Sequence, residues 1–400
     1  MKEKSIFLLV AAMIGIIAGA LCAFFGRVLL AITAFRSSHV IWLLPFLGVA
    51  GALTIFAYQK ISKESLKGMG LVMKVGFGEE EKIPILLIPL IIFGTWLSHL
   101  FGGSAGREGV AVQLGATIAN NLGRAWKIKG KQRILVLTGM AAGFAGLFQT
   151  PLTAVFFAME VMVAGVVCYD ALFPAMIAAW IASTTSHLLG LEKFSVVIPG
   201  EMVWNVGTIV KVVIIAIVFG VVGGGFAFLL KNAKKKVEQI TIAPIKRIFL
   251  IGSLLAVLFL VLHMGRYSGL GTNLIAASFD GKPIYWYDWA LKVLLTVATL
   301  AVGYQGGEVT PLFSIGASLG IVLATIFGLP LTLVAALGYA AVFGAATNTI
   351  LAPILIGVEV FGGSNMIAFV VVCTIAYICN GRQTIYGAQK SYQFEENKMI

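Results

Sequence analysis

Charged side chains are scarce in this sequence. They make up 12% of its 400 residues, whereas hydrophobic residues make up 59%. About a quarter of the residues in a soluble domain are charged, because charged groups cover its surface. The scarcity therefore excludes a soluble globular protein and predicts an all-α polytopic membrane protein. Because no long polar stretch interrupts the chain, we expect a single transmembrane domain over residues 1–400.

Cysteine and histidine are also few, with four residues of each type. The cysteines lie in apolar runs and form no C-x-x-C pair, which predicts packed thiols rather than disulfides or metal clusters. They are Cys22, Cys168, Cys373 and Cys379. The histidines, which are His39, His99, His187 and His263, show no metal-ligand spacing, so we expect neither a metal nor a cofactor. We expect His99, which lies just before the glycine-rich turn described below, to be packed or interfacial.

Motifs that mark hydrolytic enzymes are missing. The sequence has no H-E-x-x-H, no G-x-S-x-G and no histidine cluster, so we expect a protein that is not an enzyme. Its net charge of +12 comes from short clusters and not from a basic face on a soluble domain, which excludes nucleic-acid binding. The clusters are Lys2–Lys4, Arg124–Arg133, Lys231–Lys236, Lys246–Arg247 and Arg382–Lys398. Short basic loops indicate the cytoplasmic side of a lipid bilayer, next to an anionic leaflet.

A glycine-rich turn stands inside one of the most apolar parts of the chain. Its sequence is Gly102-Gly103-Ser104-Ala105-Gly106-Arg107-Glu108-Gly109-Val110, and a segment without proline continues to Asn121. A turn that leads into a helix offers unpaired N–H groups and the positive end of the helix dipole to an anion. A carboxylate at this place is expected to compete with the anion or to carry a proton. The alternative is a surface loop with Arg107 and Glu108 in water.

Two blocks of the sequence, 139–160 and 338–359, align without a gap. Seven positions carry the same residue type in both blocks. The first block has Gly139, Ala141, Ala142, Phe144, Thr150, Leu152 and Glu160, and the second has Gly338, Ala340, Ala341, Phe343, Thr349, Leu351 and Glu359 at the matching places. A glycine-rich turn precedes each block. We infer an internal repeat with halves of approximately 1–195 and 205–400. In a helical membrane protein such a repeat favours a transporter with its site between the halves, and duplicated packing without transport is the alternative.

The apolar segments predict many helices of unequal length. The candidates are 5–35, 40–58, 84–101, 110–124, 132–149, 151–166, 171–190, 207–231, 247–264, 288–303, 311–327, 330–344, 350–362 and 366–380. Several are shorter than the about 20 residues of a full span, which predicts helices that end inside the membrane and line a site. The polar interval 59–83 contains Gly68-Met69-Gly70, where glycine permits close approach to a ligand. Tyr386 is expected either at an aqueous interface or as a donor to a buried anion.

Several of these motifs resemble those of one family. Gly106-Arg107-Glu108-Gly109-Val110 resembles the G-R-E-G-P motif of CLC anion channels and anion/proton antiporters. Gly307-Glu308-Val309-Thr310-Pro311 stands in the place of the family's G-x-F-x-P, Gly68-Met69-Gly70 in that of its G-S-G, and Tyr386 in that of its late site tyrosine. The resemblance implies the CLC-type fold, with about 18 helices in two inverted repeats, re-entrant or broken helices, and a homodimer with one pore per subunit.

Departures from the family pattern point to one of its branches. Met69 replaces serine, Val309 preceded by Glu308 replaces phenylalanine, and Val110 replaces proline. This combination resembles the fluoride-selective bacterial branch, the fluoride/proton antiporters. Chloride/proton antiporters carry an inner proton glutamate at the position of Val161, which the fluoride branch also lacks. The soluble CBS domains of other members are expected to be absent.

The resemblance implies that the protein exports cytoplasmic fluoride in exchange for protons across the bacterial inner membrane. Glu108 is then the gating and proton-transfer residue. The implied anion-binding residues are Gly68, Met69, Gly70, Gly106, Arg107, Gly109, Val110, Gly307, Val309, Thr310 and Tyr386. Glu308 is either a second proton or gating group or a structural acid, and Glu160 and Glu359 are expected to bond to helix ends. A chloride/proton antiporter and a passive anion channel of the same fold are the alternatives.

Overall fold

The computed structural model describes residues 2–128 and 130–392, with side chains from Ile6 onward. The side chains of the basic residues Lys2–Lys4, and the part of Arg382–Lys398 beyond residue 392, lie outside this description. The helices are α1 (Lys2–Ser38), α2 (Val40–Leu43), α3 (Leu47–Ile61), α4 (Gly68–Gly76), α5 (Leu87–Leu100), α6 (Glu108–Ala125), α7 (Gln132–Phe148), α8 (Pro151–Glu160), α9 (Leu172–Leu188), α10 (Val206–Glu238), α11 (Pro244–Val261), α12 (Thr272–Phe279), α13 (Asp288–Val302), α14 (Val309–Phe327), α15 (Leu331–Thr347), α16 (Leu351–Phe361) and α17 (Met366–Ile378). Short 3-10 turns are η1 (Leu44–Phe46), η2 (Lys63–Lys67) and η3 (Tyr169–Ala171). The predicted all-α membrane fold is confirmed.

The helices differ greatly in length, as the sequence predicts. Within the described residues, six helical stretches are long and apolar enough to cross a membrane, among them α1, α10 and α14. Others are far too short, since the 10 residues of α8 extend only about 15 Å in a hydrocarbon core of about 30 Å. Helices such as α8 and α16 must therefore end within the membrane-spanning body of the protein.

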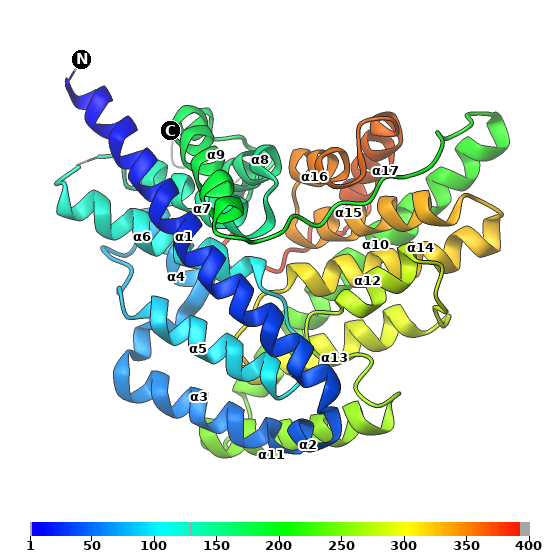
Figure 1. The fold of residues 1–400 in the computed structure, drawn as a ribbon, viewed down its shortest axis with the longest axis horizontal. Helices are drawn as coiled ribbons and strands as arrows, with labels where there is room; N and C mark the ends of the chain where they lie inside the picture. The colour runs from blue at the N-terminus through cyan, green and yellow to red at the C-terminus, as the bar shows by residue number, and fades with distance from the viewer. Residues whose placement is uncertain (1, 129, 393–400) are drawn as a thin grey trace.

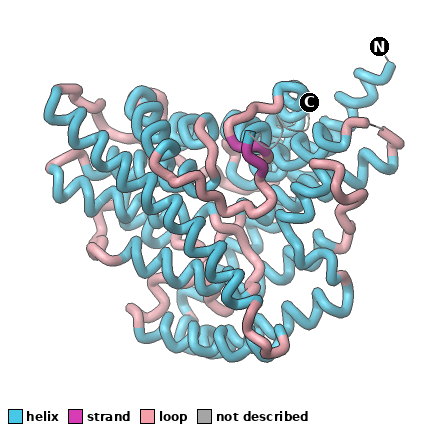
Figure 2. Tube along the Cα trace, turned by 180° about the vertical axis from the view of Figure 1, so that it is seen from behind, coloured by secondary structure: helices cyan, strands magenta, loops and turns pink. Residues whose placement is uncertain are grey.

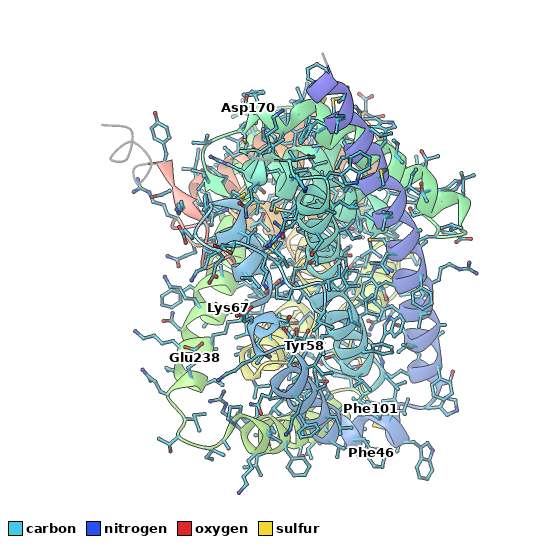
Figure 3. All side chains as sticks on the ribbon, turned by 90° about the vertical axis from the view of Figure 1, so that its left-hand side faces the viewer. Phe46, Tyr58, Lys67, Phe101, Asp170 and Glu238 are labelled. Carbon is cyan, nitrogen blue, oxygen red and sulfur yellow. The ribbon has the colours of Figure 1, made fainter. Side chains whose placement is uncertain are left out.

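The two halves of the chain form similar arrangements that face in opposite directions. In Figure 1, α1 descends from the upper left towards the lower right, whereas α10 descends from the upper right towards the lower left, so the two helices cross the view in opposite horizontal directions. Figure 3 looks onto the left-hand side of that view, where Lys67 of η2 and Glu238 at the end of α10 lie on one face. On that face Asp170 lies near one end of the molecule, and Phe46 and Phe101 lie near the other. The arrangement is the one that an inverted repeat produces.

Glycines at repeated positions let the helices of each half pack closely. A Cβ atom on Gly139 of α7 would lie 2.3 Å from the carbonyl oxygen of Gly115 on α6. In the second half, a Cβ atom on Gly338 of α15 would lie 2.2 Å from the carbonyl oxygen of Gly316 on α14. No side chain fits at such distances, so glycine is required for both helix pairs. The repeat seen in the sequence is thus a repeat of helix contacts.

Two carboxylates, one buried (Glu160) and one half-buried (Glu359), join the halves to each other. Glu160, at the end of α8, accepts hydrogen bonds from the backbone N–H groups of Leu351 (3.0 Å) and Ala352 (3.1 Å) at the start of α16. Glu359, on α16, accepts bonds from the N–H groups of Leu152 (3.1 Å) and Thr153 (2.8 Å) at the start of α8. Each acid therefore caps the helix that carries the other, and the expected scaffold role of both is confirmed.

Replacing Glu359 by glutamine is expected to destabilise the protein by about 1.5–3 kcal/mol, because bonds from N–H groups to a carboxylate are charge-assisted. An amide offers one acceptor oxygen, and its NH₂ group would face donors. Tryptophan fluorescence during heating of the detergent-solubilised protein measures the change as a lower melting temperature. The exposed Glu192 supplies a control, and a Glu192→Gln variant that melted as early as Glu359→Gln would contradict the capping role.

The structure corrects two predicted boundaries. The polar interval 59–83 is not entirely irregular, because Gly68–Gly76 form α4. The helix predicted over 151–166 ends at Glu160, and Val163–Ala164 then pair in parallel with Lys390–Ser391 as a two-stranded sheet (β1 and β2), drawn in magenta in Figure 2. Both features depend on contacts with distant segments, and α4 is also too short to show a clear helical period.

Candidate functional site

Two glycine turns, one from each half, meet in the interior of the protein. The N–H of Gly307 donates to the carbonyl oxygen of Gly106 (2.7 Å), and the N–H of Gly106 donates to that of Gly307 (2.5 Å). A Cβ atom on Gly307 would lie 2.8 Å from the backbone nitrogen of Gly109, so only glycine allows this approach. Because α6 and α14 begin directly after the turns, two helix N-termini with free N–H groups come together here.

The carboxylate of Glu108 occupies this meeting point. Glu108 is completely buried, and its Oε2 accepts hydrogen bonds from the Thr310 hydroxyl (2.5 Å) and the Thr310 N–H (3.1 Å). Its Oε1 lies 3.6 Å from Nε of Arg107 and has no hydrogen-bond partner among the described residues. One carboxylate oxygen is therefore held by donors at the start of α14, while the other accepts no hydrogen bond from the described residues.

Aromatic side chains enclose this position. The rings of Phe313 and Tyr339 are stacked, with centroids 3.9 Å apart, and Phe148 and Phe343 lie beside Phe313. Tyr386 is buried, and its phenol lies within electrostatic range of the carboxylates of Glu308 and Glu108. Burial of this kind excludes water and strengthens hydrogen bonds to a buried anion.

The first turn of α4 consists of Gly68, Met69 and Gly70. This turn is connected to the site by the side chain of Gln113, a residue that sequence analysis missed. The Gln113 side chain donates to the carbonyl oxygen of Gly109 (3.1 Å). A Cβ atom on Gly68 would lie 3.2 Å from the amide oxygen of Gln113, and Gly70 has open space around it. A glutamine one turn after Gly109 in an otherwise apolar segment is the signal that could have revealed this link.

Glu308, directly before α14, lies between the site and a basic residue. One carboxylate oxygen is 3.8 Å from Nζ of Lys234 on α10, and the other is 3.6 Å from the place that a Cβ atom on Gly109 would occupy. The Lys234 side chain is 43% exposed. Glu308 therefore lies between Gly109 and a partly exposed lysine.

Two buried basic side chains support the 102–107 turn from the other side. Nζ of Lys292, on α13, donates to the hydroxyl of Ser104 (2.9 Å) and to the carbonyl oxygens of Tyr267 (3.0 Å) and Gly269 (2.8 Å). His99 is buried, as expected, with its ring nitrogens 2.8 Å and 3.0 Å from carbonyl oxygens of Thr95 and Ala105. In the sequence, the position of Lys292 inside the apolar segment 288–303 is the feature that could have indicated this buried contact.

The predicted residues therefore fall into three groups. Those at 106–109 and 307–310 meet directly around Glu108, where Val110 and Val309 add buried apolar surface. Those at 68–70 connect through Gln113, and Tyr386 borders the site beside Phe157. Their roles in binding an anion stay predictions. The two turns thus bring two helix starts, one from each half, together around one carboxylate.

Comparison with known proteins assigns the class of this fold and site. A family model described as voltage gated chloride channel matches residues 50–381. The chain therefore belongs to the voltage-gated chloride channel family, the CLC family, and is a multi-pass membrane protein.

Within that family, the crystal structure of a CLC-type fluoride/proton antiporter is 52% identical, with a TM-score of 0.96 over 98% of this chain and 99% of the other. A chloride/fluoride channel protein of Pseudomonas syringae pv. tomato is 36% identical over 96% of this chain and 86% of its own length. A slow cyanobacterial Cl⁻/H⁺ antiporter shares the fold, with a TM-score of 0.82 over 95% of this chain and 96% of the other at 23% identity.

Proposed function

We propose that the protein is a fluoride/proton antiporter that exports cytoplasmic fluoride in exchange for protons. The observation that carries the proposal is the carboxylate of Glu108, which is buried and bound by the N–H and hydroxyl of Thr310. These donors suit any small anion, so the carboxylate and a fluoride ion compete for them. Protonation removes the negative charge of Glu108 and lets the anion take its place, which couples the two ions through one side chain.

The donors at this site favour fluoride. Fluoride is small and strongly hydrated, so only short bonds from hard donors replace its water. The Thr310 hydroxyl and the N–H groups at the start of two helices are such donors, and Met69 offers no hydroxyl for chloride. The likeness to a solved CLC-type fluoride/proton antiporter at 52% identity supports the same choice.

The proton route runs past Glu308 in this proposal. Glu308 lies beside Gly109 and near Lys234, a partly exposed residue on α10. In this proposal a proton that enters from the outer side binds Glu108, passes to Glu308 and leaves on the cytoplasmic side. Glu308 then replaces the acid that Val161 does not provide. Tyr386, within range of both carboxylates, borders the path.

Orientation and assembly follow from the same proposal. The basic segments Lys231–Lys236 and Lys246–Arg247 place the end of α10 and the start of α11 in the cytoplasm of a bacterial cell, with the inner membrane around the single domain. The short helices α8 and α16 cannot span a bilayer alone, and they lie with α9 and α17 at one end of the molecule (Figure 1). A second copy covering this end, as a homodimer, would shield them from lipid.

Reconstituted liposomes test the function. Fluoride and chloride efflux are recorded with ion-selective electrodes while a dye reports the internal pH. We expect fluoride efflux to drive proton uptake against a gradient, with chloride nearly inert. Comparable chloride flux would favour a chloride/proton antiporter, and anion flux without proton movement would define a passive channel. Either result would overturn the proposal.

Replacing Met69 by serine is expected to lower the preference for fluoride over chloride, because serine adds a hydroxyl that can coordinate chloride. The ratio of initial efflux rates in the same liposomes measures the change. Met73, a buried residue of the same helix α4, supplies the control, since Met73→Leu alters packing alone. An unchanged ratio in Met69→Ser would remove Met69 from the basis of selectivity.

A further inference from the structure

A polar pocket of about 370 Å³ lies between the end of α1 and the turn that joins α11 to α12. Its lining includes Arg36, Ser37, His263, Arg266 and Asn273. In the proposed orientation α1 and α11 both end at the outer side, so the pocket opens away from the cytoplasm. It belongs to neither glycine turn and contains none of the residues around Glu108.

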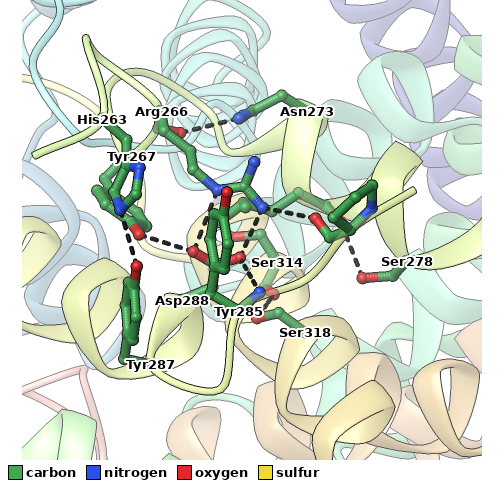
Figure 4. A network of polar contacts seen from close by, with 12 residues as sticks. His263, Arg266, Tyr267, Asn273, Ser278, Tyr285, Tyr287, Asp288, Ser314 and Ser318 are labelled. Carbon is green, nitrogen blue, oxygen red and sulfur yellow. Dashed lines mark hydrogen bonds and ion pairs between the residues drawn. The ribbon is translucent and has the colours of Figure 1, made fainter.

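The charges that line this pocket are positive. Two guanidinium groups and an imidazole face it, and no carboxylate is among its lining residues. Behind the lining, Asp288 neutralises Arg266 through two bonds of 2.6 Å and 3.1 Å (Figure 4). His263 is held by Tyr287 (2.9 Å) and stacked on Tyr285. The charge of Arg36 is the one left without a compensating acid within the described contacts.

Arg36 is buried, with an exposed fraction of only 6%. It nevertheless has an N–H donor that no hydrogen bond in the described part of the chain uses. Its NH1 group donates to the carbonyl oxygen of His99 (2.9 Å), but Nε has no hydrogen-bond partner among the described residues. A buried guanidinium that has an unpaired N–H group and no neighbouring carboxylate destabilises the folded protein, unless a bound anion accepts from that N–H group. The guanidinium crosses directly over Gly269, where a Cβ atom would meet it at 2.1 Å.

The pocket wall is bonded to the turn that leads to Glu108. The N–H of Gly269 donates to the carbonyl oxygen of Gly103 (3.2 Å), and the carbonyl oxygen of Gly269 accepts from Lys292 (2.8 Å). Lys292 in turn donates to Ser104 (2.9 Å). Two buried basic side chains, Arg36 and Lys292, thus both contact Gly269, which joins the pocket to the 102–107 turn.

We propose that this pocket is a second binding site for a small monovalent inorganic anion, with Arg36 as its main ligand. The site lies at the outer face and is separate from the position of Glu108. It holds an anion near the end of the transport path, where the positive charge of Arg36 favours its approach. The proposal concerns small anions generally and does not depend on which of them the protein exports.

The exposed Ser37, which lines the pocket, provides a reporter. A Ser37→Cys variant of the full-length purified protein is reacted with an anionic and with a neutral methanethiosulfonate reagent, and peptide mass spectrometry separates its product from those of the native cysteines. Sodium gluconate is replaced stepwise by sodium fluoride or sodium chloride at constant ionic strength. The same substitution at the exposed Ser195, outside the pocket, is the control.

Fluoride or chloride is expected to slow the anionic reagent at position 37 several-fold and to leave the neutral reagent unchanged. Adding Arg36→Gln should raise the half-effective anion concentration roughly tenfold or more, since a bond to a charged group is lost. Arg36→Lys should restore much of the effect, and Arg27→Gln, on the same helix but bonded to Leu189, should not change it.

Two results would overturn the second site. One is an equal response at positions 37 and 195. The other is an anion effect that survives Arg36→Gln in protein that remains monodisperse. Because the assay needs no transport, it can be repeated with Glu108→Gln, so failure of the outer site and failure of the antiporter function are read separately.

Discussion

Replacing Glu108 by glutamine abolishes the coupling of fluoride to protons. Glutamine has nearly the shape of glutamate but cannot carry a transported proton and brings no negative charge to compete with an anion. Its amide oxygen can still accept from Thr310, which binds Oε2 of Glu108 in the structure, so the fold should tolerate the change. We expect proton uptake driven by fluoride to fall to the background of empty liposomes.

The measurement follows internal pH in liposomes under an outward fluoride gradient. Glu192→Gln, which removes an exposed acid, is the matched control and should transport normally. A melting temperature within the range of the unmodified protein shows that Glu108→Gln is folded. Normal proton uptake by Glu108→Gln would end the assignment of this residue as the proton carrier.

Replacing Thr310 by valine has the second large effect, because the hydroxyl bonded to Glu108 is also the hard donor available to fluoride. A hydrogen bond to a charged group contributes about 1.5–3 kcal/mol, so the rate of fluoride transport should fall roughly tenfold to a hundredfold. Valine keeps the size and branching of threonine, and the backbone N–H of residue 310 remains. We therefore expect the transport rate to fall while the melting temperature stays close to that of the unmodified protein.

Initial rates of fluoride efflux at several fluoride concentrations measure this effect. Thr117→Val is the control, because the Thr117 hydroxyl is also buried but bonds to the carbonyl oxygen of Gln113 within α6 (2.7 Å). If both valine variants lose the same activity, the effect comes from helix packing and not from the site. A selective loss in Thr310→Val locates the hydroxyl on the fluoride path.

The local chemistry of the site could be predicted from the sequence, but its assembly could not. Glycine turns before helices, with Glu108 at one of them, already indicate an anion site. The pairing of Gly106 with Gly307 depends on how two halves dock, and no local pattern encodes this. Likewise Glu160 and Glu359 were expected at helix ends, whereas their exchange of partners between halves is a property of the folded repeat.

Residues that act through a neighbour were the ones missed. Gln113 and Lys292 belong to no motif, and each matters because of the groups it touches: Gly109 for the first and Ser104 for the second. A single polar residue in an apolar helix signals a buried contact but does not say with what. The helix α4 was missed for a related reason, since nine residues show little more than two helical turns.

The two carboxylates that cap each other's helices restrict the movement of one half of the protein relative to the other. Rocking one half against the other would pull Glu160 from Leu351 and Glu359 from Thr153, and would also separate Gly106 from Gly307. Several charge-assisted bonds would then break in every cycle. Rotation of the Glu108 side chain breaks far fewer contacts than such rocking, so in the proposed mechanism we expect this side chain, and not the frame, to move in each transport cycle.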